Sequence, residues 1–389
     1  MKINICLYIL FLSFISLKAR AYPDFISYGY KTCVTCHYTG SGGGALNDYG
    51  RAVFASELTA TTFTNKTPDQ LADSSGFLGS TELPYWIRPG FKYRGLWYKQ
   101  NVGNKQSVER WIQMQADAYL AIPLDKKQKY LLAANYGYIP TPDSSRYSKD
   151  DKPSNWISKE HYFRWQFNKG QFLYFGLMDK TYGIRHPDHT AYNRSILGLG
   201  QSDQSHGVTY QLSRESYEFF AQAFIGNLNQ SVDIRQKGIA LSGEKFIGHG
   251  LSVGASTILS ESDYKKESRF AVLSRVGFAK GKSILFEAGY LDNKSKTART
   301  ERDAYGIYSF MQGLIGLDQG YNFLTSYQFL KENLRDPAGT EQNKLSLGLM
   351  AFLFPRTEMR LEIVNLRTTA TQNTRPDQWN LLGQVHVSW

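Results

Sequence analysis

The feature that most constrains the fold of this 389-residue chain is an alternation of apolar and polar side chains that starts near Trp86 and continues to the C-terminus. Between residues 111 and 120 every second side chain is apolar: Ile112, Met114, Ala116, Ala118 and Leu120. The same alternation occurs at residues 162–167 and 359–363. A period of two places successive side chains on opposite faces of a β-strand. The sequence therefore predicts a long series of β-strands, each with one apolar and one polar face.

Turn residues divide this region into about sixteen expected strands. They lie near residues 86–100, 108–122, 129–140, 160–168, 171–182, 206–214, 217–226, 238–246, 251–261, 267–279, 283–292, 303–313, 320–331, 343–354, 357–368 and 378–389. An even number of antiparallel strands is what single-chain bacterial barrels require.

The connections between these strands alternate in length. Those at 140–159, 183–205, 293–302, 332–342 and 369–377 are long and polar, whereas those at 124–128, 168–170, 213–216, 279–282 and 355–356 are short. A soluble β-sandwich is the alternative, because alternating strands occur in both folds. Short periplasmic turns and long external loops favour an antiparallel transmembrane β-barrel over residues 83–389. On this interpretation the charged Arg360 and Glu362 face the lumen.

The N-terminus predicts a signal peptide over residues 1–21. Lys2 precedes an apolar run from Ile3 to Leu17, and Ala19-Arg20-Ala21 fits the small-x-small cleavage rule. A transmembrane helix is the alternative, but the run is short for a hydrocarbon core of roughly 30 Å. We therefore expect Cys6 to be removed and the mature chain to begin near Tyr22.

The composition excludes two other classes of protein. The mean hydropathy is −0.41, and no later stretch approaches about 18 consecutive apolar residues, so a helical membrane protein is excluded. The net charge is +11, but nucleic acid is not an expected partner of a secreted chain. Loop lysines and arginines are instead expected to face outer-membrane lipid. The chain ends on alternating apolar residues and Trp389, like the assembly signal of outer-membrane proteins.

The remaining two cysteines lie in the motif Cys33-Val34-Thr35-Cys36-His37. A disulfide is one interpretation in an oxidising compartment. A two-residue spacer followed directly by histidine is, however, the spacing of c-type haem attachment. The motif predicts one covalent haem c, with Cys33 and Cys36 bound to its vinyl groups and His37 as the proximal iron ligand.

The residues around this motif form a small region, 22–82, of different character. A glycine run, Gly42–Gly44, precedes a segment in which Leu46, Tyr49 and Val53 fall at helical spacing. We expect a short helix there that covers the porphyrin edge. Residues 59–80 are predicted to be a polar linker with one helical turn near Pro68.

The haem motif followed by Leu46-Asn47-x-Tyr49-Gly50-Arg51 and then a barrel resembles the fused monohaem cytochrome–porin family, whose best-known members are outer-membrane iron oxidases. The residue match covers about 25–54. The resemblance implies a haem plug in or under the pore that passes electrons between an extracellular donor or acceptor, such as Fe²⁺, and a periplasmic cytochrome or other carrier. The glycine run at 42–44 departs from the iron-oxidase pattern, so fold and haem carry over more safely than iron oxidation.

The small region lacks a usual sixth iron ligand, because residues 38–85 contain neither His nor Met. The haem is therefore five-coordinate, or the barrel supplies a distal ligand. Three histidines are candidates: His386, expected on the lumen face of the last strand, and His186 and His189 in the longest loop, which could fold inward. His249 is expected in a periplasmic turn. Each has the alternative of an ordinary solvated histidine, and the loop pair, beside Asp188, could also form an external metal site.

Three functions are consistent with these features. The leading hypothesis is an electron conduit across the outer membrane, and the family resemblance implies an iron-oxidase-like activity for it. The alternative is a diffusion porin or small-solute transporter in which the haem region is a plug or gate. A third, catalysis at an open iron position, has no acid–base pair near the motif to support it.

Overall fold

The computed structural model describes residues 23–80, 83–102, 107–140, 154–296, 303–336, 339–370 and 377–389. The predicted signal peptide, residues 1–21 with Cys6, lies outside these residues.

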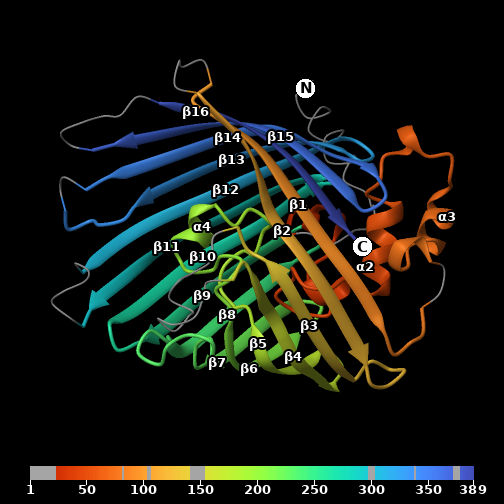
Figure 1. The fold of residues 1–389 in the computed structure, drawn as a ribbon, viewed down its shortest axis with the longest axis horizontal. Helices are drawn as coiled ribbons and strands as arrows, with labels where there is room; N and C mark the ends of the chain where they lie inside the picture. The colour runs from red at the N-terminus through yellow and green to blue at the C-terminus, as the bar shows by residue number, and fades with distance from the viewer. Residues whose placement is uncertain are drawn as a thin grey trace, which may run out of the picture.

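The alternating segments form a barrel. Within the described ranges, sixteen strands pair antiparallel, each with its neighbours in sequence, and β1 pairs with β16 to close the sheet (Figure 1). The strands are β1 (Arg88–Gln100), β2 (Val108–Pro123), β3 (Tyr130–Tyr138), β4 (Trp156–Asn168), β5 (Gln171–Met178), β6 (Ser205–Ser213), β7 (Tyr217–Phe224), β8 (Lys237–Ile247), β9 (Leu251–Glu261), β10 (Lys265–Ala279), β11 (Lys282–Ser295), β12 (Ala304–Asp318), β13 (Tyr321–Lys331), β14 (Glu341–Phe354), β15 (Thr357–Thr369) and β16 (Gln378–Ser388). The prediction of a closed barrel is confirmed, and the β-sandwich is excluded.

The two faces of the strands differ as the alternation predicted. On β15, Leu361 and Ile363 are each 51% exposed on the outer wall, whereas Glu358 is 1% exposed on the lumen side. Arg360 binds Glu358, and Glu362 accepts a hydrogen bond from the buried Ser346, so both predicted charges face the lumen. The apolar outer wall is the surface that a barrel presents to lipid.

The alternation in β2 is not continuous, which corrects the prediction for residues 112–120. A β-bulge opposite Arg94 and Gly95 shifts the register, and Met114 is the extra, buried residue. Beyond the bulge the faces exchange, because one inserted residue reverses the side-chain parity. Trp111, rather than Ile112, is therefore the exposed apolar side chain near the outer end of the strand.

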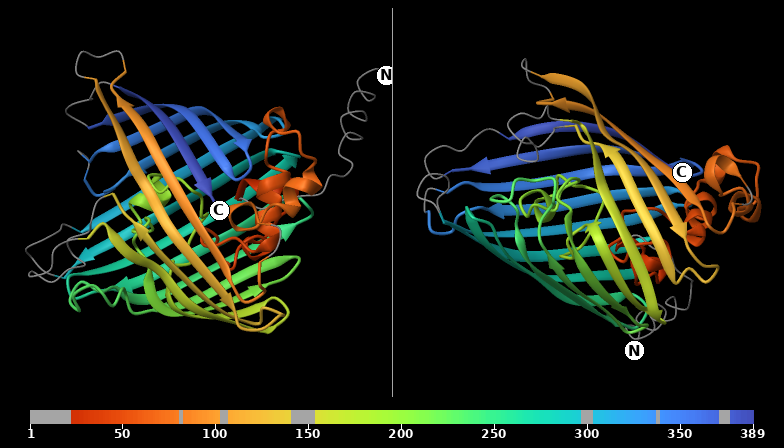
Figure 2. Two further views of the ribbon diagram at one scale, coloured as in Figure 1. Left: turned by 45° about the vertical axis from the view of Figure 1, so that its right-hand side comes forward. Right: turned by 60° about the horizontal axis from the view of Figure 1, so that its bottom comes forward.

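The short connections predicted at 124–128, 168–170, 213–216, 279–282 and 355–356 lie at one end of the barrel, with the C-terminus, whereas the short turn between β9 and β10 lies at the other end (Figure 1). In outer-membrane barrels the end with the C-terminus faces the periplasm. Residues 23–80, which we call the plug, lie at and inside the same end (Figure 2). The plug contains the 3₁₀ turns η1 (Pro23–Tyr28), η2 (Cys33–Thr35), η3 (Thr61–Phe63) and η4 (Phe77–Gly79) and the helices α2 (Asp48–Ser56) and α3 (Pro68–Asp73). No helix among the described residues is long and apolar enough to cross a membrane.

The plug is fixed to the inner wall of the barrel by polar and apolar contacts. Asp24, 4% exposed, accepts hydrogen bonds from Gln312 at 2.9 and 3.1 Å and from Ser283 at 3.4 Å. Apolar plug side chains pack with residues of β12, β13 and β14: Phe25, Tyr30 and Leu58 with Leu314, Leu324, Met350 and Phe352. The first expected helix is present as α2 but begins at Asp48, because Asn47 is its N-cap. The helical turn expected near Pro68 is α3.

The connection between β5 and β6 enters the barrel. We call residues 179–204 the inward loop; it contains α4 (Tyr192–Ser195) and crosses the interior in Figures 1 and 2. Gln222 on the wall binds the backbone of Asp179 and Thr181 at 3.0 Å each, so the chain leaves the sheet after Met178. The strand expected at 171–182 is therefore four residues shorter. Further in, Gln328 accepts the backbone N–H of Tyr192 at 2.9 Å.

Candidate functional site: a cavity between the plug and the barrel wall

A large cavity lies where the plug, the inward loop and the barrel wall meet. It contains about 1410 Å³ of space free of protein atoms, part of it open to solvent. The three residues of the predicted haem motif line it, and so do all three candidate distal histidines: Cys33, Cys36, His37, His186, His189 and His386. Segments that are far apart in sequence therefore supply one site.

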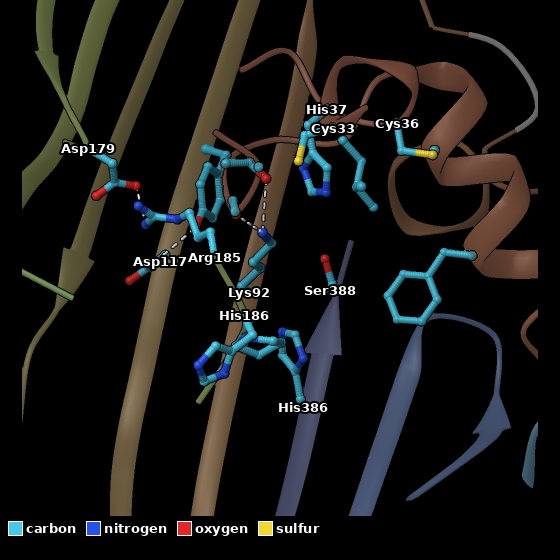
Figure 3. A pocket seen from close by; sticks show the side chains of 18 of the residues that line it. Cys33, Cys36, His37, Lys92, Asp117, Asp179, Arg185, His186, His386 and Ser388 are labelled. Atoms are coloured by element: carbon cyan, nitrogen blue, oxygen red, sulfur yellow. Dashed lines mark hydrogen bonds and ion pairs between the residues drawn. The ribbon is translucent and has the colours of Figure 1, made fainter. Parts of the chain in front are cut away.

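The motif is held in a tight turn, and Figure 3 shows Cys33 and His37 directed into the cavity and Cys36 directed toward the neighbouring helix. The backbone N–H groups of Cys36 and His37 both donate to the carbonyl of Cys33, at 3.1 and 2.9 Å. This turn is η2, with Cys36 as its C-cap and His37 directly after it. An isolated β-bridge from His37 to Leu46 then ties the motif to the segment before α2.

Asn47 and Gly50 attach α2 to the motif. The Asn47 side chain donates to the carbonyls of Val34 and Thr35, at 3.3 and 3.1 Å, and its Oδ1 accepts the N–H of Gly50 at 2.8 Å. A Cβ atom at Gly50 would lie 2.3 Å from the carbonyl oxygen of Cys36. Only glycine therefore allows α2 to pack this closely on the motif.

The glycine run wraps around the first thiol. Gly42 and Gly43 have φ values of +73° and +84°, which favour glycine. A Cβ atom at Gly42 would lie 3.4 Å from Cys33 Sγ. Lys92, from β1, donates to the carbonyls of Gly43 and Gly44, the latter at 2.9 Å. The glycine run therefore holds the motif against the barrel wall.

Of the motif side chains, Cys36 is buried, and Cys33 and His37 are half-buried. Cys33 carries a free thiol, so it is not joined to Cys36, which is 3% exposed. Burial raises the pKa of the Cys33 thiol to about 12. Burial, assisted by the Lys92 ammonium, lowers the pKa of His37 to about 3, so the imidazole is neutral at pH 7. Within the described part of the chain, His37 Nδ1 has no hydrogen-bond partner.

His186 is held by a chain of buried hydrogen bonds. Its Nε2 meets Asn193 Oδ1 at 2.9 Å, and Asn193 donates to Glu287 at 3.0 Å. Tyr308 donates to the same carboxylate at 2.8 Å. The His186 ring also stacks on Phe310, with centroids 4.3 Å apart. This network fixes the inward loop to β11 and β12.

His189 and His386 have different surroundings. His189 lies on the inward loop, and Gln201 Nε2 meets its Nδ1 at 3.1 Å. His386 is on β16, 6% exposed, and faces the lumen as its parity predicted. Its Nδ1 is 3.7 Å from Glu358 Oε2. His249, in contrast, is exposed in the turn between β8 and β9.

The cavity wall also carries charged residues that the sequence analysis did not identify. Lys92 and Arg94 come from β1, Arg185 from the inward loop and Arg275 from β10. Arg185 pairs with Asp179, and Arg275 pairs with Glu244 at 2.6 Å. In the sequence, the spacing of residues 92 and 94 places both on one face of their strand. Only the closed barrel shows that this face, with its two cations, is turned toward the plug. Among the described residues, no group of three or more His, Cys, Asp or Glu side chains is arranged to hold a metal ion.

Comparisons with known proteins agree on the architecture. No protein-family model matches the chain, and no curated protein matches it by sequence. Solved structures similar to it include OmpT of Vibrio cholerae (TM-score 0.58, 11% identity, 78% of this chain and 97% of that chain). Others are an anion-selective porin from Comamonas acidovorans (0.56, 9%, 78% and 99%) and the outer-membrane channel DcaP of Acinetobacter baumannii (0.56, 11%, 78% and 97%).

These similarities define the class of protein. The chain is a closed, antiparallel β-barrel of the bacterial outer membrane with a porin-like fold. At about a tenth of residues identical, the likeness concerns the fold and not the site. The covered share of this chain, 78%, matches the extent of the barrel.

Proposed function

We propose that residues 33–37 bind one covalent haem c and that this chain, as a cytochrome–porin, passes electrons between an extracellular donor or acceptor, such as Fe²⁺, and a periplasmic carrier. The observation that carries the proposal is that Cys33, Cys36 and His37 line one cavity between the plug and the barrel wall. A haem supplies reversible one-electron chemistry when bound.

The residues present fit such a group. The Cys33 thiol is free, and the half-buried His37 imidazole is neutral.

The two halves of the cavity suit the two halves of a porphyrin. On one side the plug contributes apolar side chains, including Leu46, Val53 and Phe54. On the other side the barrel contributes charged side chains of both signs, the cations Lys92 and Arg94 and the carboxylates Asp117 and Glu160. Porphyrin carboxylates pair favourably with cations, whereas the ring requires apolar packing and exclusion of water.

The family motif has a structural role that supports the resemblance. Asn47 and Gly50 hold the attachment turn, as described above. Arg51 donates to the Leu46 carbonyl at 3.3 Å and to the Pro89 carbonyl of β1 at 2.5 Å. The motif residues therefore connect the attachment turn to the barrel wall, which is the task of a plug that carries a cofactor.

The experiment is electron transfer across a membrane. The full chain, expressed with a c-type maturation system, is reconstituted in liposomes that contain oxidised cytochrome c, and Fe²⁺ is added outside. We expect reduction of the enclosed cytochrome in these liposomes. A Cys33→Ala/Cys36→Ala variant, which folds the same barrel without attachment, is the matched control. Equal rates in both preparations would refute the proposal.

A diffusion porin is the second candidate, because the structural neighbours include named porins and channels. In that case the plug and the inward loop restrict a polar pore. This function predicts ion conductance in planar bilayers that persists when His37 is replaced. The seating of the plug on the wall through Asp24 and the apolar cluster favours a closed pore and hence the conduit.

A further inference from the structure

The cavity wall opposite the motif contains several side chains with donor atoms, and their hydrogen bonds distinguish them. Figure 3 shows His37 on one side of the cavity and His186 and His386 on the other. A metal-bound histidine commonly gives its second ring N–H to a carboxylate or carbonyl and keeps the other nitrogen for the metal. The distal candidates can therefore be compared by which nitrogen is free.

His186 has the less suitable nitrogen available. Its Nε2 is engaged by Asn193, which leaves Nδ1. Nδ1 is adjacent to the carbon that joins the ring to the backbone, so binding through it brings the main chain against a wide planar macrocycle. The stack on Phe310 and the link to Glu287 also oppose rotation of the ring.

His189 and the other donors are also engaged. At His189, Nδ1 meets Gln201 Nε2 at 3.1 Å, and the inward loop, rather than a strand of the sheet, carries the ring. Other donor atoms in the cavity lining belong to Lys92, Lys159, Tyr30 and Tyr119, and Lys159 pairs with Asp117 at 2.6 Å. Lys92 binds two plug carbonyls, Tyr30 binds Tyr49, and Tyr119 donates to Asp117 at 3.1 Å.

His386 has both ring nitrogens available. Nδ1 lies 3.7 Å from Glu358 Oε2, beyond hydrogen-bond distance but within reach of a small rotation of the ring, and that carboxylate is itself held by Arg360 at 2.5 Å. Within the residues that the structure describes, neither ring nitrogen has a hydrogen-bond partner, although the residue is 6% exposed. A rigid strand of the sheet carries the ring, between Arg94 of β1 and Glu358 of β15.

We infer that His386 is the distal ligand of the haem iron, through Nε2, and that Glu358 is its positioning residue. This inference rests on the proposed function, because it requires the haem on the motif. It makes the last strand of the barrel part of the redox site, so plug and barrel each supply one axial ligand. It also predicts a six-coordinate iron with no open position for catalysis.

Spectroscopy of the matured full-length protein tests the inference. We expect a low-spin ferric haem in the parent protein, by optical and electron paramagnetic resonance spectra. In His386→Ala the low-spin signal should be lost, carbon monoxide should bind the ferrous form, and added imidazole should restore the low-spin spectrum. His386→Met should remain low-spin at a higher reduction potential, because thioether ligation raises it.

The controls separate the candidates. His249→Ala, at an exposed turn, should leave the spectrum unchanged, and so should His186→Ala and His189→Ala. Glu358→Gln keeps the imidazole but removes the carboxylate, so it should raise the reduction potential without loss of the low-spin signal. This variant tests the same pair if His386→Ala is poorly produced.

The outcomes distinguish the two proposals. A colourless protein would refute the haem itself and thus the proposed function. A haem protein whose spectrum is unchanged in His386→Ala, or that loses its low-spin signal in His186→Ala instead, would overturn this inference alone. A five-coordinate parent protein would also overturn it.

Discussion

Replacing Asn47 with alanine should loosen the attachment turn without disturbing the barrel. Asn47 makes three hydrogen bonds in the plug, one as the N-cap of α2 and two to the carbonyls of Val34 and Thr35. Loss of an N-cap costs about 1 kcal/mol, and each further bond contributes about 1 kcal/mol net. The expected loss of local stability is therefore about 3 kcal/mol.

Hydrogen exchange measures this loss directly. At 1.4 kcal/mol per factor of ten, about 3 kcal/mol corresponds to roughly a hundredfold lower protection of the backbone amides in residues 33–56. The assay is exchange with mass spectrometry on the protein in detergent micelles. Protection in the barrel strands should not change.

Thr67→Ala is the matched control, because Thr67 is also a helix N-cap in the plug. It caps α3 at an exposed position through a bond of 3.3 Å to Gln70. Its loss should lower protection in α3 by about 1 kcal/mol and leave residues 33–56 unaffected. The reasoning is refuted if the two variants lower protection of residues 33–56 equally.

Three further predictions concern the plug and the inward loop. Gly50→Ala should lower the yield of haem-containing protein and destabilise the plug by about 1–3 kcal/mol, because the added Cβ overlaps a motif carbonyl; haem absorbance per protein checks it. Asp24→Ala should lower the stability of the plug by about 1.5–3 kcal/mol, because the hydrogen bonds to Gln312 are lost, and should raise ion conductance in planar bilayers. Unchanged conductance would show that Asp24 does not hold the plug in the pore. Burial lowers the pKa of His186 and His189 to about 4 from 6.5, so the unfolded loop binds more protons below pH 6.5. The stability of the inward loop should therefore fall as the pH drops from 6.5 towards 4, by up to about 1.4 kcal/mol per pH unit for each histidine. Hydrogen-exchange protection of the loop should be lower at pH 5 than at pH 7.5, after correction for the intrinsic exchange rate. This difference should disappear when both His186 and His189 are replaced by glutamine.

The sequence predicts the barrel well because its signal is local. A lipid-facing strand needs an apolar side chain at every second position, so the number of strands could be predicted from the alternating segments. The same alternation predicted that Arg360 and His386 face the lumen. The bulge at Met114 could not be predicted from β2 alone, because the extra residue is defined by the pairing of β2 with β1. The early end of β5 also depends on another strand, because Gln222 of β7 binds the backbone of Asp179 and Thr181 and directs the chain into the barrel.

The site divides in a similar way. Cys33, Cys36 and His37 are recognisable because the attachment chemistry fixes their spacing, and the structure places them in one cavity. Lys92 and Glu358 carry no motif, because their roles depend on which wall of the closed barrel faces the plug. Their contribution follows only from the register of β1, β15 and β16.

The central claim is that the attachment turn in the barrel mouth carries a haem through thioether bonds. Intact-mass spectrometry of the purified mature protein, denatured after expression with a c-type maturation system, measures this directly. The account predicts a mass increased by one haem, which is lost in the Cys33→Ala/Cys36→Ala variant. A mature chain with the unmodified mass would contradict it.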